Sequence, residues 1–187
     1  WKPTTYQNIK ETTITILGLG EIGKLVAERF VALGFQVKGW SNSPKNINGV
    51  ESFAGKEGLN AAISNTNFIV NILPLTDDTE GILNKDFFAQ CSAHTVLVNV
   101  GRGAHLDEKD LLIAIEEKQI KEAYLDVFVE EPLPENHPFW TNKNIYVTPH
   151  IASVTNATTA LKQVADNYNR MKNNETLLNE VSLERGY

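Results

Sequence analysis

The sequence predicts an α/β fold organised around a doubly wound parallel sheet. Short apolar segments typical of strands alternate along the chain with amphipathic helical segments. Most of these strands are apolar at consecutive positions, which is typical of parallel strands covered by helices on both faces. The length of 187 residues and an ordinary hydrophobic content of 42% fit a single globular domain.

The first strand–helix–strand unit begins at Thr13. A β-rich run, Thr13 to Leu17, leads into Gly18–Gly23 with the sequence GLGEIG, and a helical pattern follows directly. Its apolar side chains recur at three- and four-residue steps and share one stripe: Ile22, Leu25, Val26, Phe30 and Leu33. Gly34 ends the helix, and Phe35 to Trp40 is the second strand.

Each glycine of this turn has a physical role in binding a dinucleotide. Gly18 permits a tight turn, Gly20 lets the backbone approach a pyrophosphate, and Gly23 lets the helix and strand pack closely. The diphosphate would lie at the helix N-terminus, where N–H groups and the helix dipole favour an anion. The glycine spacing alone is weak evidence, but the strand before it and the helix after it predict a Rossmann-type domain.

The remaining elements continue the alternation. Asp107 is expected to cap a helix whose residues Leu111, Leu112 and Ile115 face inward. In chain order, the predicted elements are a helix at Leu59 to Ile63, a strand at Phe68 to Leu73, a helix at Lys85 to Cys91, a strand at Thr95 to Val100, a helix at Asp107 to Lys118, strands at Tyr124 to Val127 and Ile145 to Thr148, and a helix at Asn156 to Lys172 with Leu161, Val164, Ala165, Tyr168 and Met171 on its apolar face.

Composition argues against several classes of function. The net charge of −6, without a run of Lys or Arg, argues against a nucleic-acid partner. No apolar stretch approaches the about 20 residues that span a bilayer, so we expect no membrane partner. The single cysteine, Cys91, excludes a disulfide within the chain and a cysteine metal cluster, and it suits a cytoplasmic protein. We predict no metal site.

In a doubly wound sheet, ligands bind beyond the C-terminal ends of the strands. That rule brings three side chains to one edge: Arg102 between two glycines, Glu131 in a proline-rich loop, and His150 after Pro149. Each residue alone fits a surface or structural role better. Together they match the reduction of a 2-keto acid, which needs a carboxylate anchor, a proton donor and a carboxylate that keeps this donor charged.

The sequence resembles the D-2-hydroxyacid dehydrogenases along essentially its whole length. The resemblance lies in GLGEIG at Gly18–Gly23, NILPLTDDTEGIL at Asn71–Leu83, the segment Val98–Pro134, and VTPHIAS at Val147–Ser153. The segment WSNSPKNINGVESFAG and the terminal RGY are most similar to the glyoxylate/hydroxypyruvate reductase A branch. The resemblance implies reduction of glyoxylate or hydroxypyruvate to the 2-hydroxy acid with a nicotinamide cofactor.

The resemblance also implies individual roles. Arg102 would bind the substrate's carboxylate and carbonyl oxygen, and His150 would protonate the carbonyl as general acid. Glu131, rather than its neighbour Glu130, would pair with His150, and Asp126 would contact the nicotinamide amide. The full set of expected cofactor contacts is Gly18, Gly20, Glu21, Ile22, Gly23, Trp40, Ser41, Asn42, Ser43, Lys45, Leu73, Pro74, Thr79, Val100, Gly101 and Asp126.

The loop after the second strand bears on the choice of cofactor. Enzymes that use NAD typically carry Asp or Glu here, about 20 residues beyond the glycine turn. Ser41 to Lys45 contains no acid, and its hydroxyls and Lys45 could accept a 2′-phosphate, so NADP(H) is favoured over NAD(H). The reductase A branch usually has Arg in this loop, where this chain has Asn42.

The chain resembles one part of a two-domain enzyme. It begins with Trp1, and its single Met is Met171, so we expect a single-domain fragment that lacks the substrate domain. The expected parts are a crossover segment at 1–12, the dinucleotide-binding domain at 13–175 and a return segment at 176–187. Such a fragment would bind cofactor with little turnover, expose apolar surface and form a homodimer, as the family commonly does through this domain.

Alternative functions remain open on the same scaffold. A nucleotide-sensing or corepressor-like binding protein would need no proton donor, and a structural module would bind no cofactor. Relatives acting on phosphoglycerate, lactate or formate differ mainly in the domain that this chain lacks.

Overall fold

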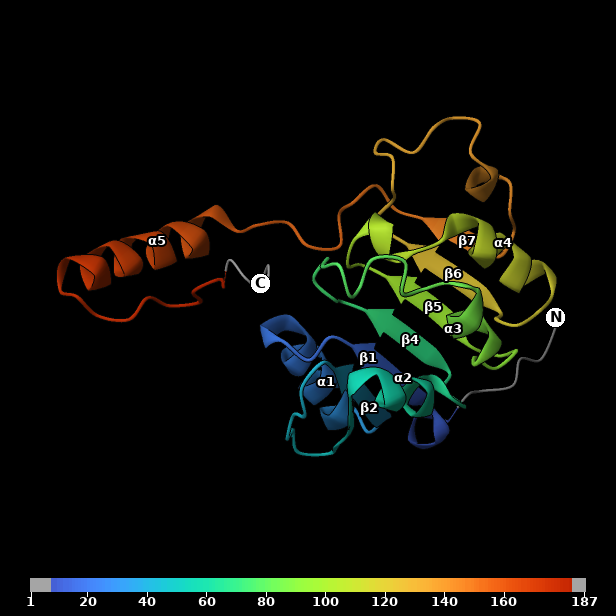
Figure 1. The fold of residues 1–187 in the computed structure, drawn as a ribbon, viewed down its shortest axis with the longest axis horizontal. Helices are drawn as coiled ribbons and strands as arrows, with labels where there is room; N and C mark the ends of the chain where they lie inside the picture. Colours follow the sequence, from blue (N-terminus) through green and yellow to red (C-terminus); the bar gives the residue numbers. More distant parts are fainter. Residues whose placement is uncertain (1–7, 183–187) are drawn as a thin grey trace.

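The computed structural model describes residues 8–182 and contains one sheet of seven parallel strands in the order β3-β2-β1-β4-β5-β6-β7 (Figure 1). The strands are β1 (Thr13–Leu17), β2 (Gln36–Ser41), β3 (Val50–Ala54), β4 (Phe68–Asn71), β5 (Val96–Asn99), β6 (Glu122–Leu125) and β7 (Ile145–Val147). The order reverses between β1 and β4, which places the ligand crevice of such a sheet beyond these two strands. The expected start of the crossover segment and the terminal RGY lie outside the described residues.

Within residues 8–182, five α-helices connect or follow the strands: α1 (Glu21–Ala32), α2 (Gly55–Ile63), α3 (Lys85–Ala89), α4 (Glu108–Glu116) and α5 (Ala157–Lys172). Each predicted strand and helix is present, with boundaries shifted by a few residues. Asp107 caps α4 through bonds from the Lys109 and Asp110 amides. Strand β3 was not predicted, because this edge strand has no buried residue and so lacks an apolar signature.

Successive side chains of the central strands pack into two different cores. Ile69 and Leu97 belong to the larger core, on the face covered by α2, α3 and α4, whereas Ile14, Ile16 and Val70 belong to the α1 side. Period-two alternation explains this division, because neighbouring side chains of a strand point to opposite faces. The sheet therefore buries apolar residues on both faces, as expected for parallel strands.

The apolar stripe predicted for α1 is only partly covered: Val26 and Phe30 pack against the core on this side of the sheet. The buried residues of the helix are Gly23 and Ala27, whereas Ile22, Leu25 and Leu33 are 61%, 51% and 64% exposed. Small residues let the helix backbone lie against β1, so the larger apolar side chains are displaced to the side and outward.

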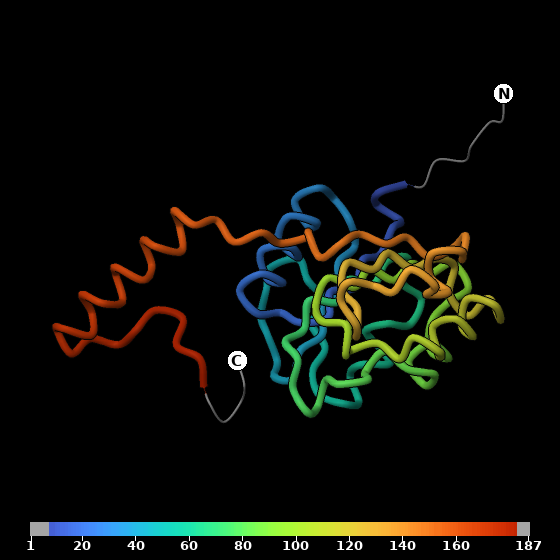
Figure 2. Tube along the Cα trace, turned by 90° about the horizontal axis from the view of Figure 1, so that it is seen from above, coloured from blue at the N-terminus to red at the C-terminus, as the bar shows by residue number. Residues whose placement is uncertain are grey.

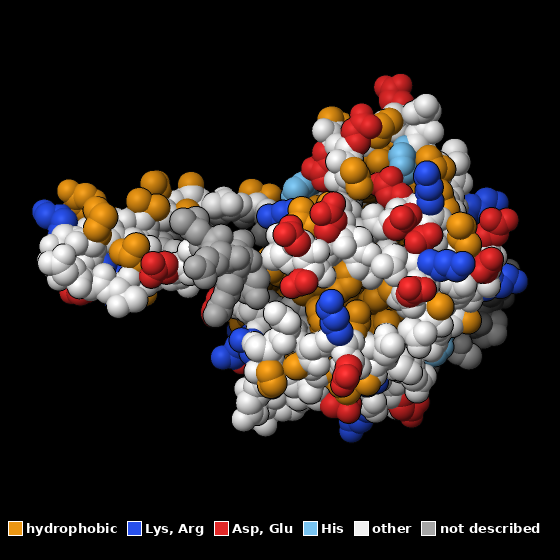
Figure 3. All heavy atoms as spheres, in the orientation of Figure 1, with side chains coloured by type: hydrophobic (Ala, Val, Ile, Leu, Met, Phe, Trp, Pro, Cys, Tyr) orange, Lys and Arg blue, Asp and Glu red, His pale blue; other side chains and the backbone are white. Residues whose placement is uncertain are grey.

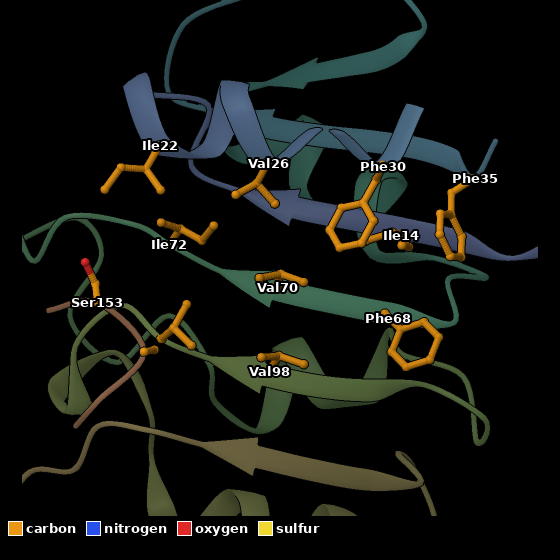
Figure 4. A pocket seen from close by; sticks show the side chains of 12 residues that line it. Ile14, Ile22, Val26, Phe30, Phe35, Phe68, Val70, Ile72, Val98 and Ser153 are labelled. Carbon is orange, nitrogen blue, oxygen red and sulfur yellow. The ribbon is translucent and has the colours of Figure 1, made fainter. Parts of the chain in front are cut away.

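An open apolar groove of about 580 Å³ lies beside α1, on the sheet face that no described helix covers over β4 and β5 (Figure 4). It is lined by Ile14, Ile22, Val26, Phe30, Phe35, Phe68, Val70, Ile72, Val98, Val100, Ala152 and Ser153. We expected helices to cover both faces of the sheet. On the face that carries α1, this is the case only near β1 and β2.

Helix α5 extends away from the body that contains the sheet, as both views of the chain show (Figures 1 and 2). It contains no buried residue, and its predicted apolar face, including Leu161, Val164, Tyr168 and Met171, is exposed (Figure 3). The expected domain boundary at residue 175 stays a prediction. None of the helices within residues 8–182 is long and apolar enough to cross a membrane.

Candidate active site

The glycine turn joins β1 to α1 at the crevice, and two of its glycines are required by geometry. Gly18 has φ +101°, donates its N–H to Trp40 O at 2.8 Å, and would place a Cβ 3.0 Å from Ile72 O. A Cβ on Gly23 would lie 1.7 Å from Gly18 O, far inside contact distance. The turn therefore lies in close contact with the residue after β4, and the start of α1 lies in close contact with the turn.

The start of α1 leaves space for an anion, and the sequence predicts the diphosphate there. Gly20 is the N-cap of α1, no side chain caps the helix there, and a Cβ on Gly20 would meet nothing within 4 Å. The first N–H groups of a helix have no partner within the helix, so they are available to an anion. Glu21 and Ile22 are exposed in this first turn.

The loop after β2 divides into buried and exposed residues. Trp40 is buried and donates its Nε1–H to Gly55 O at 2.8 Å, and buried Ser41 donates its hydroxyl to Ser43 O at 2.8 Å. Asn42, Ser43 and Lys45 are exposed, and the loop carries no carboxylate. The exposed part can therefore accept a phosphate, whereas Trp40 and Ser41 shape the loop.

The loop after β4 is closed by its own hydrogen bonds. The hydroxyl of buried Thr79 donates to Pro74 O at 2.7 Å and accepts the Thr76 amide at 2.8 Å. Thr79 thus fixes the course of the backbone. Leu73, which precedes Pro74, is buried, and Val100 in the loop after β5 is partly buried.

Glu131 and His150 form the pair expected from the sequence. His150 Nδ1 lies 2.7 Å from Glu131 Oε2, and Glu131 Oε1 accepts the Phe128 amide at 2.9 Å. The hydrogen bond from His150, followed by that from Phe128, lowers the pKa of Glu131. This favours an ionised Glu131 beside the imidazole, and the side chain of His150 is 49% exposed. Glu130 is exposed and makes no such pair.

Asp126 holds the loop that carries His150. Its Oδ1 accepts the Thr148 hydroxyl at 2.5 Å and the Ile151 amide at 2.9 Å, and its Oδ2 accepts the Ala152 amide at 2.9 Å. Burial by itself would raise the pKa of Asp126, but these hydrogen bonds, together with the charge of His150, lower it overall. They also hold His150 at φ +52°, a conformation that costs a non-glycine residue about 1–3 kcal/mol.

Arg102 is exposed at the same edge of the sheet, in the loop after β5. Its Nη1 donates to Gly101 O at 2.8 Å. A Cβ on Gly103 would lie 1.9 Å from the Phe128 carbonyl carbon, so this loop packs directly on the one that carries Glu131. Backbone contact thus joins the loops of Arg102 and Glu131, and the side chains of Glu131 and Asp126 join the loop of His150 to them.

A buried polar network beneath these loops was not predicted. Asn71, Asn99 and His105 are all 0% exposed and hydrogen-bond to one another or to nearby backbone. The sequence places an Asn at the end of each of two apolar strands, Asn71 and Asn99. Because buried side-chain amides need hydrogen-bond partners, this pattern could have indicated the network.

The family model described as "D-isomer specific 2-hydroxyacid dehydrogenase, NAD binding domain" matches residues 1–152. The chain belongs to this family. It is the NAD-binding part, a seven-stranded Rossmann-like domain, as the resemblance implied.

Relatives agree with this assignment. Glyoxylate/hydroxypyruvate reductase A of Yersinia enterocolitica is 46% identical over all 187 residues, and the chain spans 60% of that relative's length. A D-isomer specific 2-hydroxyacid dehydrogenase from Xanthobacter autotrophicus, solved with NADPH and MES, superposes with TM-score 0.96 at 38% identity, covering 100% of this chain and 77% of that one. The NADPH-dependent glyoxylate/hydroxypyruvate reductase of Sinorhizobium meliloti, solved with NADP and sulfate, gives 0.94 at 35% identity, covering 100% and 60%.

Proposed function

We propose that the whole protein reduces a small 2-keto acid, glyoxylate or hydroxypyruvate, to the 2-hydroxy acid, and that this chain binds the cofactor. The observation that carries the proposal is the 2.7 Å contact between His150 and Glu131 at the ligand edge of the sheet. A pure nucleotide-binding protein has no need of a proton donor fixed by a carboxylate. The reductases among the relatives support the choice of substrate.

The residues divide the chemistry among them. A bound reduced nicotinamide would supply the hydride that adds to the carbonyl carbon. Arg102 binds the substrate carboxylate and polarises the carbonyl oxygen, and an exposed guanidinium suits bidentate recognition of a carboxylate. The imidazolium of His150 gives its Nε2 proton to that oxygen, which completes the hydroxyl group, and Glu131 stabilises the imidazolium and orients the ring. Asp126 contacts the nicotinamide amide and holds the His150 loop.

NADPH is the proposed cofactor. The acid-free Ser41–Lys45 loop offers hydroxyl, amide and ammonium groups to a 2′-phosphate, and relatives from Xanthobacter and Sinorhizobium are bound to NADPH or NADP. Calorimetric titration of this chain with NADPH and, separately, NADH tests this. Tighter NADPH binding supports the loop as a phosphate site, whereas tighter NADH binding contradicts the cofactor preference and leaves the dehydrogenase assignment intact.

The activity itself is tested in the whole protein. We expect NADPH oxidation with glyoxylate or hydroxypyruvate, and little turnover by this chain alone, because the substrate domain is proposed to complete the cleft and exclude water. NADPH binding by the whole protein without turnover of these or other 2-keto acids would favour the nucleotide-sensing alternative.

Assembly and location belong to the same proposal. We propose a cytoplasmic homodimer. The open apolar groove and the exposed apolar side chains of α1 support the association of two chains. Sedimentation of the whole protein at micromolar concentration tests the oligomeric state, and a monomer would contradict it.

A further inference from the structure

His105 lies at the centre of the buried polar network, directly beneath the loop that carries Arg102. The ring bridges two chain segments: its Nδ1 lies 3.2 Å from the Arg102 backbone nitrogen, and its Nε2 lies 3.2 Å from Pro74 O. The first segment carries the proposed substrate anchor, and the second is a proposed cofactor loop. His105 itself is 0% exposed, so it contacts neither ligand directly.

The partners of the ring allow one tautomer. Arg102 donates its backbone N–H to Nδ1 of His105. The side-chain nitrogen of Asn71, Nδ2, also lies 2.9 Å from Nδ1, so Nδ1 must be an acceptor. Pro74 O can only accept, so Nε2 must carry the proton and donate it. The orientation of Asn71 is fixed independently, since its Oδ1 accepts the Leu73 amide at 3.3 Å. The ring is therefore neutral and protonated at Nε2.

The strand ends hold the ring in place. Asn71 and Asn99 are register partners on β4 and β5, and Asn71 Nδ2 donates to Asn99 Oδ1 at 2.9 Å. Asn99 Oδ1 also accepts the Gly101 amide at 3.2 Å. A Cβ on Gly101 would lie 3.0 Å from both Asn71 Nδ2 and His105 Nδ1, so the loop backbone lies directly on the network.

The backbone of His105 is fixed as well. Its carbonyl accepts the Leu83 amide at 2.9 Å, and the Asp107 amide donates to Leu83 O at 3.1 Å. Gly81 donates its amide to Ala104 O at 2.9 Å. Because both the ring and the backbone are held, a change at His105 must displace the Arg102 loop or leave buried polar groups without partners.

We propose that His105 is a positioning residue that fixes the Arg102 backbone relative to Pro74, so that the guanidinium is held at the substrate edge beside the cofactor loop. The proposal rests on the proposed function only through the role of Arg102. Protonation would put an N–H on Nδ1 opposite the N–H groups of Arg102 and Asn71, so the bridge requires the neutral ring.

The electrostatics agree with a neutral ring. Burial lowers the pKa of His105, the hydrogen bond to Pro74 opposes this, and the positive charge of Arg102 lowers it further. Within residues 8–182, Arg102 is the charged group that acts on the ring in this way.

Nitrogen NMR of the whole protein tests the bridge without any assay of activity. We expect His105 to show the neutral Nε2–H form, and to keep it as the pH falls through about 6.5, the ordinary value for histidine. A ring protonated at Nδ1, or one that becomes charged near pH 6.5, would overturn the proposal. Exchange of the Arg102 amide with solvent should be slow, and faster in His105→Leu than in the native protein.

Kinetics of matched variants test the consequence. His105→Leu removes both ring nitrogens, and we expect KM for the keto acid to rise by up to about 100-fold, as for a misplaced binding group, with a much smaller change in NADPH affinity. His105→Asn can place its side-chain oxygen near the Nδ1 position, so it should recover much of that loss. His94→Asn changes an exposed histidine outside the site and is the control.

The outcomes separate the two proposals. A folded His105→Leu protein with native KM and native Arg102 amide exchange would overturn the positioning role. Absence of keto-acid turnover in the native protein would instead contradict the proposed function, while the NMR result would still decide whether the bridge exists. If His105→Leu does not fold, His105→Asn and the native tautomer give the decision.

Discussion

Nδ1 of His150 lies 2.7 Å from Oε2 of Glu131, and this contact joins the loops that follow β7 and β6. The second Glu131 oxygen is held by the Phe128 amide at 2.9 Å, so the carboxylate cannot rotate without losing a bond. The side chain of His150 is nevertheless 49% exposed. A histidine that is fixed on one side and open on the other is suited to passing a proton to a ligand.

The pair gives a first prediction. In the whole protein, His150→Asn should lower kcat by about 10²- to 10⁴-fold, the usual contribution of a general acid, with NADPH affinity little changed. Glu131→Gln should also lower kcat, because it removes the charge that stabilises the imidazolium. Steady-state kinetics measure both, and Glu130→Gln, an exposed neighbour with the same change, is the control. Native turnover in His150→Asn would contradict the assigned role.

A second prediction separates fold from cofactor binding within the glycine turn. Gly23→Ala would place a Cβ 1.7 Å from Gly18 O, so it should destabilise the domain by about 3 kcal/mol or prevent folding. Gly20→Ala places a Cβ in open space and should leave the melting temperature nearly unchanged while weakening NADPH binding. Thermal unfolding and calorimetry give the two readouts. Native affinity in Gly20→Ala would mean that the diphosphate does not lie there.

A third prediction concerns the choice of cofactor. Asn42→Asp introduces a carboxylate that repels a 2′-phosphate and can accept hydrogen bonds from a ribose hydroxyl. The ratio of NADPH to NADH affinity should fall by about tenfold or more, equivalent to about 1.4 kcal/mol. Asn60→Asp, an exposed position on α2, makes the same chemical change away from the loop. Equal ratios in the two variants, measured by calorimetry, would place the ribose elsewhere.

A fourth prediction follows from the lowered pKa of Asp126. The pKa of Asp126 is lower in the folded state than in the unfolded chain. The carboxylate therefore stabilises the protein fully at pH values above the ordinary Asp pKa of about 3.9. This stabilisation is lost as the pH falls through the lowered pKa of the folded state. Asp126→Asn retains one acceptor oxygen, and the amide group faces the Ala152 N–H, so we expect a loss of roughly 1–3 kcal/mol at neutral pH.

Denaturant unfolding between pH 3 and pH 7 compares the two proteins. The difference in unfolding free energy should be largest at neutral pH and shrink toward the acid end. A constant difference across the range would show that Asp126 does not titrate with a lowered pKa.

Several features were predictable because they depend on nearby residues. The turn at Gly18–Gly23, the cap at Asp107 and the alternating order of strands and helices are encoded within short stretches of chain. The pairing of Glu131 with His150 was predictable from the family resemblance, and the strand order explains it, since β6 and β7 are parallel neighbours.

Other features depend on contacts between distant residues. The sequence did not indicate that His105 lies buried against Asn71, which is 34 positions away. It predicted that the apolar residues of α1 share one stripe, but not that Ile22, Leu25 and Leu33 stay exposed. A helical pattern shows which side chains share a face but not which surface will cover that face.

The sequence by itself thus determined the fold class, the site of the glycine turn and the residue types at the ligand edge, because these follow from local spacing and strand order. The tertiary structure decided which charged groups meet, how Asp126 and His105 hold the loops, and that one apolar face of the sheet is left open in a groove. These outcomes depend on register and burial, which are set when segments far apart in the chain pack together.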